Sequence, residues 1–210
     1  MTSYEHFMLG FSGAIACGLQ RRCGWSIAAM AGVAAVLPDW DGLSLMFGAA
    51  AFDRVHRTWG HNVFAAVLLA TAVAVAEYRY GWLAKTGGWF STKVRLSQQD
   101  DAAGDRAVNG RCGWLLWIAV AVAASLSHIG TDMLFSGHAT LSDWGLRLFW
   151  PFSSREWVYP MVSWGDPAVS ILFAAGMFAM FRWSARLQGV ATVTLAAVAA
   201  YVLLRGWVLR

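Results

Sequence analysis

Long runs of apolar residues are the feature that most constrains this chain. Residues 62–80, 113–135, 168–183 and 189–207 carry almost no charge except near their ends. A segment of about 20 apolar residues is long enough to cross a bilayer as a helix. Backbone groups inside lipid must hydrogen-bond to one another, so such segments fold as helices. We therefore predict an all-α, polytopic helical membrane protein with about four full spans.

Two shorter apolar stretches, residues 7–19 and 24–37, precede these runs. We expect them to form a shorter N-terminal helical pair, either as thin or tilted spans or as a hairpin that enters the membrane only partway. Gly10, Ala14 and Gly18 are four residues apart, which lets a neighbouring helix approach closely. The whole chain, 1–210, is predicted to be a single integral membrane domain. A polar loop is expected at 84–112 and an interfacial aromatic segment at 138–167.

The composition supports this class and excludes others. Apolar residues make up 58% of the chain and charged residues 13%, against about 25% charged residues in a typical soluble domain. This balance excludes a disordered chain, a coiled coil and a nucleic-acid-binding domain, so we expect membrane lipids and no nucleic acid as partners. The three cysteines are odd in number and lack CxxC spacing, which predicts neither a disulfide framework nor a thiolate metal site. No sequence feature sets the oligomeric state.

The basic residues predict an orientation. If the helices alternate in direction, ten of the sixteen Lys and Arg residues lie on one side of the membrane: Arg21, Arg22, Arg79, Lys85, Lys93, Arg95, Arg106, Arg111, Arg182 and Arg186. The positive-inside rule places that side in the cytoplasm. Cys17, Cys23 and Cys112 then lie on or near the reducing side.

All five histidines are predicted on the opposite, non-cytoplasmic side. Half of the twelve acidic residues join them there: Asp39, Asp41, Asp53, Asp132, Asp143 and Asp166. Imidazole and carboxylate groups together form the ligand set of zinc and similar divalent ions. Four separate segments bring the histidines to this one side, which favours a shared polar site.

His128 and Asp132 have the most suggestive local spacing. A separation of four residues places both side chains on one face of a helix, as two ligands of one ion require. The alternative is a simple His–Asp hydrogen bond at the end of the helix. Their position within an apolar run favours a functional role, because ionisable groups there are costly.

Two loop motifs offer further ligands. His56 and His61 are five residues apart, with Gly60 between them, so we expect His61 at the start of a helix and His56 on the loop before it. Asp39 and Asp41 follow Pro38, which ends the preceding helix, and are expected on a turn. The alternatives are interfacial histidines beside a lipid headgroup and a solvated acidic turn. His6 and His138 are the remaining candidate ligands.

The ordered motifs resemble one known family. They are His6, Leu37-Pro-Asp-Trp-Asp41, His56-Arg-x-x-x-His61, His128-x-x-x-Asp132, Gly145 and Trp150-Pro-Phe-Ser153. This series is similar to the YdjM-type family of predicted bacterial membrane-bound metal-dependent hydrolases, and the resemblance covers roughly residues 4–185. It implies a multi-pass protein of the bacterial inner membrane. That family is in turn distantly similar to zinc-dependent phospholipases C and single-strand nucleases.

The resemblance also implies roles for individual residues. Asp39, His61, His128 and Asp132 would hold one ion, Asp132 would bridge to a second ion held partly by His6, and His138 would belong to another site. The soluble enzymes also use the amino terminus of a processed chain and a later His and acid pair as ligands. This chain shows no evident processing and has no histidine after His138. We therefore expect one or two divalent ions, with zinc as the metal. Asp143 and Glu156 are available as substitute ligands, but nothing in the sequence selects either of them.

These observations favour a membrane-bound metal-dependent hydrolase that acts on a phosphoester of a lipid or another amphiphile. Asp41 would orient a ligand or take a proton. Arg57 would neutralise a phosphate, or serve only as a headgroup contact. The aromatic segment is expected to cover the site. Two other classes stay open: a metal-ion or proton-coupled transporter, and a non-catalytic membrane protein with a structural metal.

Overall fold

The computed structural model describes residues 1–83, 85–86, 112–135, 145–163, 165–208. These residues form helices joined by short connections, and an isolated antiparallel bridge between Leu146 and Trp157 is the one strand-like pairing among them. The all-α prediction is confirmed. The elements are α1 (Ser3–Ala16), α2 (Leu19–Cys23), α3 (Trp25–Val36), η1 (Leu37–Phe47), α4 (Ala49–Val55), α5 (Val63–Tyr80), α8 (Trp114–Leu134), α9 (Pro167–Arg182), η2 (Ser184–Arg186) and α10 (Leu187–Val208).

Three segments are long and apolar enough to cross a membrane: Val63–Tyr80, Trp114–Leu134 and Ser184–Val208. They match three of the four predicted spans. The fourth, α9, is a shorter apolar helix of 16 residues. Large apolar side chains face outward from these helices, including Leu68, Phe178 and Leu203. Such an outer surface suits contact with lipid tails.

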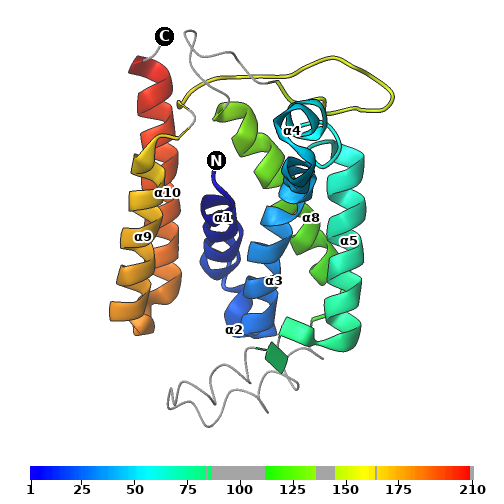
Figure 1. Ribbon diagram of the computed structural model, residues 1–210. Helices are drawn as coiled ribbons and strands as arrows, with labels where there is room; N and C mark the ends of the chain where they lie inside the picture. The colour runs from blue at the N-terminus through cyan, green and yellow to red at the C-terminus, as the bar shows by residue number, and fades with distance from the viewer. Residues whose placement is uncertain (84, 87–111, 136–144, 164, 209–210) are drawn as a thin grey trace.

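The short N-terminal helices form the centre of the bundle. Helix α3 packs against both α1 and α8, and α10 lies on the other side of α1 (Figure 1). Gly10 allows the close approach of α1 to α3, because a Cβ atom there would clash with the carbonyl oxygen of Ala31. The predicted small-residue contact is therefore present at Gly10.

Two sequence predictions are wrong in detail. Asp39 and Asp41 do not lie on a simple turn, because η1 continues from α3 as a 3-10 helix with Pro38 in its first turn. Proline lacks an N–H donor, and the first turn of a helix does not need one. The expectation of no disulfide is also wrong, since Cys23 is bonded to Cys112 across 89 residues. Cys17 is free and exposed.

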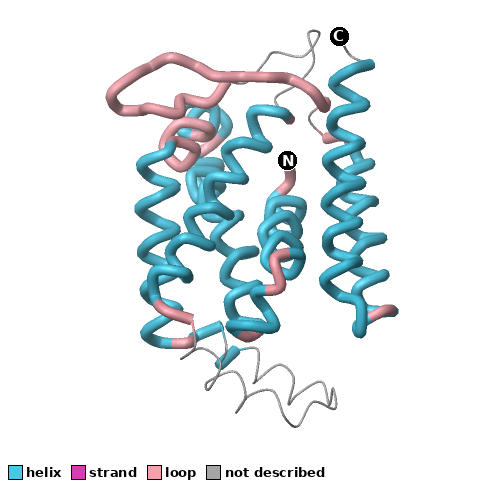
Figure 2. The backbone as a smooth tube through the Cα atoms, turned by 180° about the vertical axis from the view of Figure 1, so that it is seen from behind, coloured by secondary structure: helices cyan, strands magenta, loops and turns pink. Residues whose placement is uncertain are grey.

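The described part of the aromatic segment, residues 145–163, crosses one end of the bundle (Figures 1 and 2). Backbone hydrogen bonds attach it to the ends of two spans: Leu148 accepts one from Val63, and the N–H groups of Tyr159 and Met161 donate to Met133 and Leu134. Phe149, Phe152 and Tyr159 are exposed. The segment therefore presents aromatic side chains outward at that end.

Candidate metal centre

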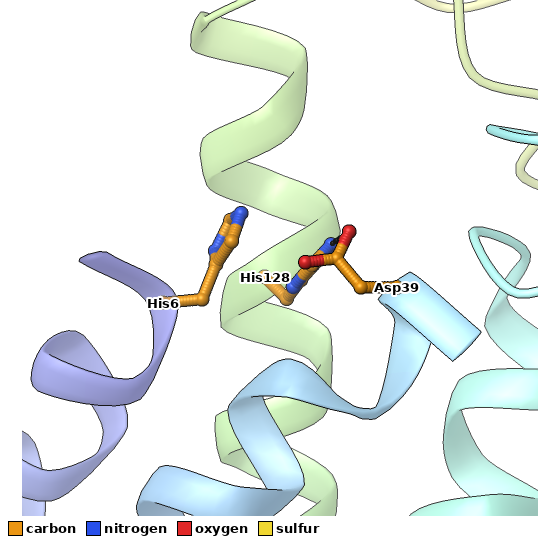
Figure 3. Close-up of side chains that lie close together, drawn as sticks. All are labelled: His6, Asp39 and His128. Carbon is orange, nitrogen blue, oxygen red and sulfur yellow. Dashed lines mark ion pairs between the residues drawn. The ribbon is translucent and has the colours of Figure 1, made fainter. Parts of the chain in front are cut away.

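Four segments deliver the candidate ligands to the end of the bundle that residues 145–163 cross. Asp39 comes from η1, His61 from the connection before α5, and both His128 and Asp132 from the last two turns of α8. Figure 3 shows His6 of α1 beside His128, with Asp39 approaching from η1. Gly60 lets the connection before α5 lie against η1, because a Cβ atom there would clash with the carbonyl oxygen of Pro38.

Four side-chain atoms form a compact cluster, which we call the four-donor cluster: Asp39 Oδ1, His61 Nε2, His128 Nε2 and Asp132 Oδ2. The two Nε2 atoms are 3.1 Å apart. Asp39 Oδ1 lies 3.5 and 3.6 Å from them, and Asp132 Oδ2 lies 3.4 and 3.6 Å from them. Tetrahedral zinc with bonds of 2.0–2.2 Å separates its ligands by about 3.3–3.6 Å. These five distances are close to the ligand separations of a tetrahedral zinc site, although Asp39 and Asp132 do not share one group of donor atoms within 4.8 Å of one another.

The hydrogen bonds of both imidazoles leave lone pairs facing the centre of the cluster. His128 Nδ1 lies 2.7 Å from the carbonyl oxygen of Ala35, so Nδ1 donates and Nε2 is free to bind a metal. His61 Nδ1 likewise donates to Asp41 Oδ2 at 3.1 Å. Each imidazole Nε2 atom thus lies beside one carboxylate oxygen of Asp39 and one of Asp132, a set of donors that a bound cation would satisfy.

Asp41 acts on the cluster from outside. Its Oδ2 accepts hydrogen bonds from His61 and from the Gly60 N–H at 2.8 Å, and its Oδ1 accepts one from His56 at 2.8 Å. A carboxylate behind a ligating histidine fixes the tautomer and the ring orientation. Of the two roles predicted for Asp41, the geometry favours orientation of a ligand over proton transfer.

Charge within this network shifts two pKa values. Burial alone would raise the pKa of the Asp41 carboxyl, but the hydrogen bonds from His56, His61 and Gly60 hold it below its ordinary value. Burial alone would lower the pKa of His61, but hydrogen bonds to Asp132, Asp39 and Asp41 raise it well above its ordinary value. A proton taken up by His61 would lie on Nε2, the atom that faces Asp39 and Asp132 and that a metal would bind.

The second oxygen of Asp132 faces a different set of groups. Its Oδ1 lies 3.0 Å from His6 Nε2 and 2.8 Å from the amino group of Met1. The ring of His6 stacks on that of His128 with centroids 3.6 Å apart. His6 therefore lies beside the four-donor cluster, with a ring nitrogen within 4.8 Å of ligand atoms of Asp39 and His128 and Nε2 against the second oxygen of Asp132.

Arg57 supplies positive charge at the same point. Its guanidinium is buried, and Nη2 lies 3.7 Å from Asp132 Oδ2. The backbone at Arg57 has φ of 63°, a region that non-glycine residues rarely adopt and that is often found at functional sites. The carbonyl group of Arg57 accepts a hydrogen bond from the Arg147 N–H at 3.4 Å, so residues 145–163 help to hold this loop.

A cavity of about 560 Å³ opens onto one side of the cluster. Its lining includes Asp39, Asp132, His56 and Arg57, together with Glu5 and residues 165–167 and 170. His61 and His128, whose side chains are fully buried, do not line it. The carboxylate edge of the cluster therefore faces the cavity, and the imidazole edge faces the protein interior.

The other predicted site residues have different positions. A ring nitrogen of His56 lies within 4.8 Å of ligand atoms of Asp39 and His61, but Nδ1 of His56 is hydrogen-bonded to Asp41. His138 and Asp143 lie outside the described residues. Glu156 is exposed and pairs with Arg147 at 3.0 Å, so it is not a substitute ligand. None of the described residues 145–163 lines the cavity, so the expected cover is not formed by that part of the segment.

Several contributors were missed by sequence reasoning. Ser3 donates to Asp39 Oδ2 at 2.7 Å, and Ala35 contributes only its carbonyl group. Glu5 forms a capping box with Thr2 and accepts a hydrogen bond from Ser170 at 2.6 Å, which ties α1 to α9 at the cavity. The Thr2-x-x-Glu5 spacing is a sequence signal for a helix start, whereas Ser3 and Ala35 have no comparable signal.

Comparisons with known proteins support the resemblance drawn from the motifs. The model of the family described as YdjM inner membrane protein matches residues 1–209. No curated protein and no solved structure matched the chain. The distant similarity to phospholipases C therefore stays a prediction. With a match over nearly its full length, the chain belongs to the YdjM inner membrane protein family.

Proposed function

We propose that this protein is a membrane-bound, zinc-dependent hydrolase that cleaves a phosphoester of a lipid or another amphiphile. The observation that carries the proposal is the four-donor cluster, in which the Nε2 atoms of His61 and His128 each lie 3.4–3.6 Å from a carboxylate oxygen of Asp39 and of Asp132, beside a cavity. A buried arrangement of this kind is costly without a cation.

Each group at the site would have a separate role in the proposed reaction. Asp39, His61, His128 and Asp132 would hold a divalent ion, which would supply Lewis acidity and lower the pKa of a water molecule toward about 7. Asp39 and Asp132 leave access from the cavity, so a substrate oxygen would approach along that edge. Arg57, which lines the same cavity, would donate paired hydrogen bonds to a phosphate. Asp41 would keep His61 in the ligating tautomer.

The location supports an amphiphilic substrate. The site lies at the ends of α5 and α8, two of the segments long enough to span a membrane. Exposed aromatic residues, including Trp40 and Trp59, occur at the same end. Tryptophan is enriched where a membrane meets water. A phosphoester group of a lipid at that level would lie near the cavity.

One observation favours a structural metal instead. Four protein donors fill a four-coordinate zinc site, and structural sites are closed in this way. A catalytic ion would need a fifth ligand from the cavity side. The alternative function is therefore a non-catalytic membrane protein that zinc stabilises, with a metal-ion transporter as the third class.

One experiment separates these functions. The protein is purified in lipid nanodiscs, its bound metal is measured, and hydrolysis of phospholipid and of a generic phosphodiester is assayed for wild type, His128→Ala and Asp53→Ala. Asp53 is an exposed carboxylate of α4 outside the cavity lining, so it serves as the control. Zinc-dependent turnover lost only in His128→Ala supports the hydrolase. Absence of metal overturns it, and tight zinc without turnover favours the structural alternative. Metal uptake into vesicles that is lost in Asp132→Ala favours transport.

We further propose that the site faces the non-cytoplasmic side of the inner membrane. The basic residues on α2 and at the end of α9 lie at the other end of the bundle (Figure 1), which favours a cytoplasmic location for that end. The Cys23–Cys112 disulfide lies there too and favours the opposite orientation, because disulfides persist in oxidising compartments. The exposed thiol of Cys17 decides between them. An impermeant maleimide added to intact cells should leave Cys17 unlabelled, and efficient labelling would reverse the orientation.

A further inference from the structure

The segment Leu43–Ala51 runs from the second half of η1 through Gly48 into the first turn of α4 and is an exposed apolar surface beside the cavity; we call it the apolar loop. Leu43, Leu45, Met46 and Phe47 are 64%, 59%, 83% and 84% exposed. No charged residue occurs from Gly42 to Phe52. Exposure of several adjacent large apolar side chains marks an interaction surface, since soluble surfaces rarely carry them together.

The two ends of the apolar loop are fixed to the site. Gly42, just before the loop, lines the cavity and directly follows Asp41. Phe52, just after it, also lines the cavity and stacks on His56 with ring centroids 4.4 Å apart. The loop therefore leaves the cavity wall, exposes its apolar side chains, and returns to the cavity wall.

The surroundings of the apolar loop favour a lipid leaflet as its partner. η1 contacts the span α5, whose Phe64 and Leu68 are exposed near the same end. Trp40 and Trp59, both partly exposed, lie before and after the loop in the chain, as expected at a membrane–water interface. The first charged residues, Asp53 and Arg54, are exposed on α4 and mark the polar boundary. The chain also belongs to an inner membrane protein family.

We propose that the apolar loop inserts into the lipid leaflet beside the cavity, and that amphiphilic substrate enters the cavity from the plane of the membrane. Insertion removes Met46 and Phe47 from water and is favourable for that reason. It also brings lipid headgroups to the edge lined by Gly42, Phe52 and Arg57. The entry of substrate rests on the proposed hydrolase function, whereas insertion does not.

Insertion is measured with spin labels. Met46→Cys and, as the matched control, Asp53→Cys are each made in a Cys17→Ser background, labelled without reductant, and placed in nanodiscs. Both positions are exposed, so neither change should disturb folding, and bound metal equal to that of the wild type checks this. The label at 46 should collide with oxygen more than with a water-soluble nickel chelate, and the label at 53 should show the reverse. Equal nickel access at both positions, or shielding of position 46 from both reagents by another protein copy, overturns insertion.

Substrate entry is measured by activity. Phe47→Glu places a charge on the apolar loop, and Ser154→Glu places the same charge at an exposed serine of residues 145–163. Phe47→Glu should lower turnover of phospholipid in nanodiscs by about tenfold or more and leave a short-chain, water-soluble phosphodiester unaffected. Ser154→Glu should change neither. Equal lipid turnover by wild type and Phe47→Glu overturns this mode of entry. If wild type cleaves neither substrate, the proposed hydrolase function fails, while the spin-label result still decides insertion.

Discussion

The two ends of the bundle hold the same pair of helices in different ways. At one end, Cys23 before α3 is joined covalently to Cys112 before α8. At the other end, His128 of α8 donates a hydrogen bond to the carbonyl group of Ala35 in α3, and Asp39 Oδ1, on η1 after α3, lies 3.6 Å from His128 Nε2 in the four-donor cluster.

The difference lies in what each end needs to stay closed. A disulfide holds its two residues together without any ligand. A set of four converging lone pairs is stable only when a cation or a proton lies among them. The disulfide end is therefore expected to be indifferent to metal, and the cluster end to depend on it.

The largest expected effect is a loss of zinc affinity when a residue of the four-donor cluster is replaced. His128→Ala removes one of the four donors and leaves the other three with a vacant position. Zinc affinity should fall by more than about 100-fold, because loss of an outer partner alone typically costs about 10–100-fold. Chelator competition measures it. Wild-type zinc binding by His128→Ala would show that the cluster is not the metal site.

Loss of the Cys23–Cys112 disulfide should lower the stability of the protein without changing its zinc affinity. Replacement of Cys23 and Cys112 by serine should lower the free energy of unfolding by about 2–4 kcal/mol, measured by thermal or denaturant unfolding. Zinc affinity should stay near that of the wild type, and Cys17→Ser serves as the control for loss of a thiol. A parallel fall in zinc affinity would show instead that α3 and α8 couple the two ends.

A smaller loss of zinc affinity is expected from a change at Asp41, which hydrogen-bonds to the ligand His61. Asp41→Asn keeps the shape of the side chain but weakens its hold on His61 and His56. Zinc affinity should fall by about 10–100-fold, and Asp53→Asn should have no effect. Unchanged affinity in Asp41→Asn would contradict the orienting role.

Metal binding should also depend on pH. In the metal-free protein the pKa of His61 is raised by Asp132, Asp39 and Asp41, so a proton occupies His61 below that raised value. The metal must displace this proton, and affinity should rise with pH by about tenfold per unit until the raised pKa is passed. Calorimetry in two buffers of different ionisation enthalpy should detect release of a proton. Affinity independent of pH would contradict the assigned protonation.

The smallest change in zinc affinity is expected from a substitution at Ser3. Its hydroxyl group donates to Asp39 Oδ2 from the rim of the cavity. Ser3→Ala removes one exposed hydrogen bond, so zinc affinity should fall by only about 2–10-fold. Isothermal titration against wild type measures this change. A loss as large as that of His128→Ala would mean that Ser3 determines the position of Asp39.

Much of the fold followed from apolar run length. Val63–Tyr80 and Trp114–Leu134 match predicted runs almost to the residue, because a helix in lipid must be both long and apolar. The 3-10 helix η1 was not predicted, since Pro38 and Asp41-Gly42 are compatible with a turn or with a helix start. The Cys23–Cys112 bond was not predicted either, because nothing local links residues 89 positions apart.

For the candidate site, the sequence by itself determined which residue types gather at one end. Alternating helices return each His and Asp motif to the same side, and the i, i+4 spacing of His128 and Asp132 places both on one face. Only the tertiary structure decided which atoms converge. It placed Asp41 behind His61, His6 beside the second oxygen of Asp132, and the carboxylate edge toward the cavity. The physical reason is that tautomers, ligand angles and access depend on contacts between distant segments, such as the Ala35 carbonyl group and His128, which leave no pattern in the sequence.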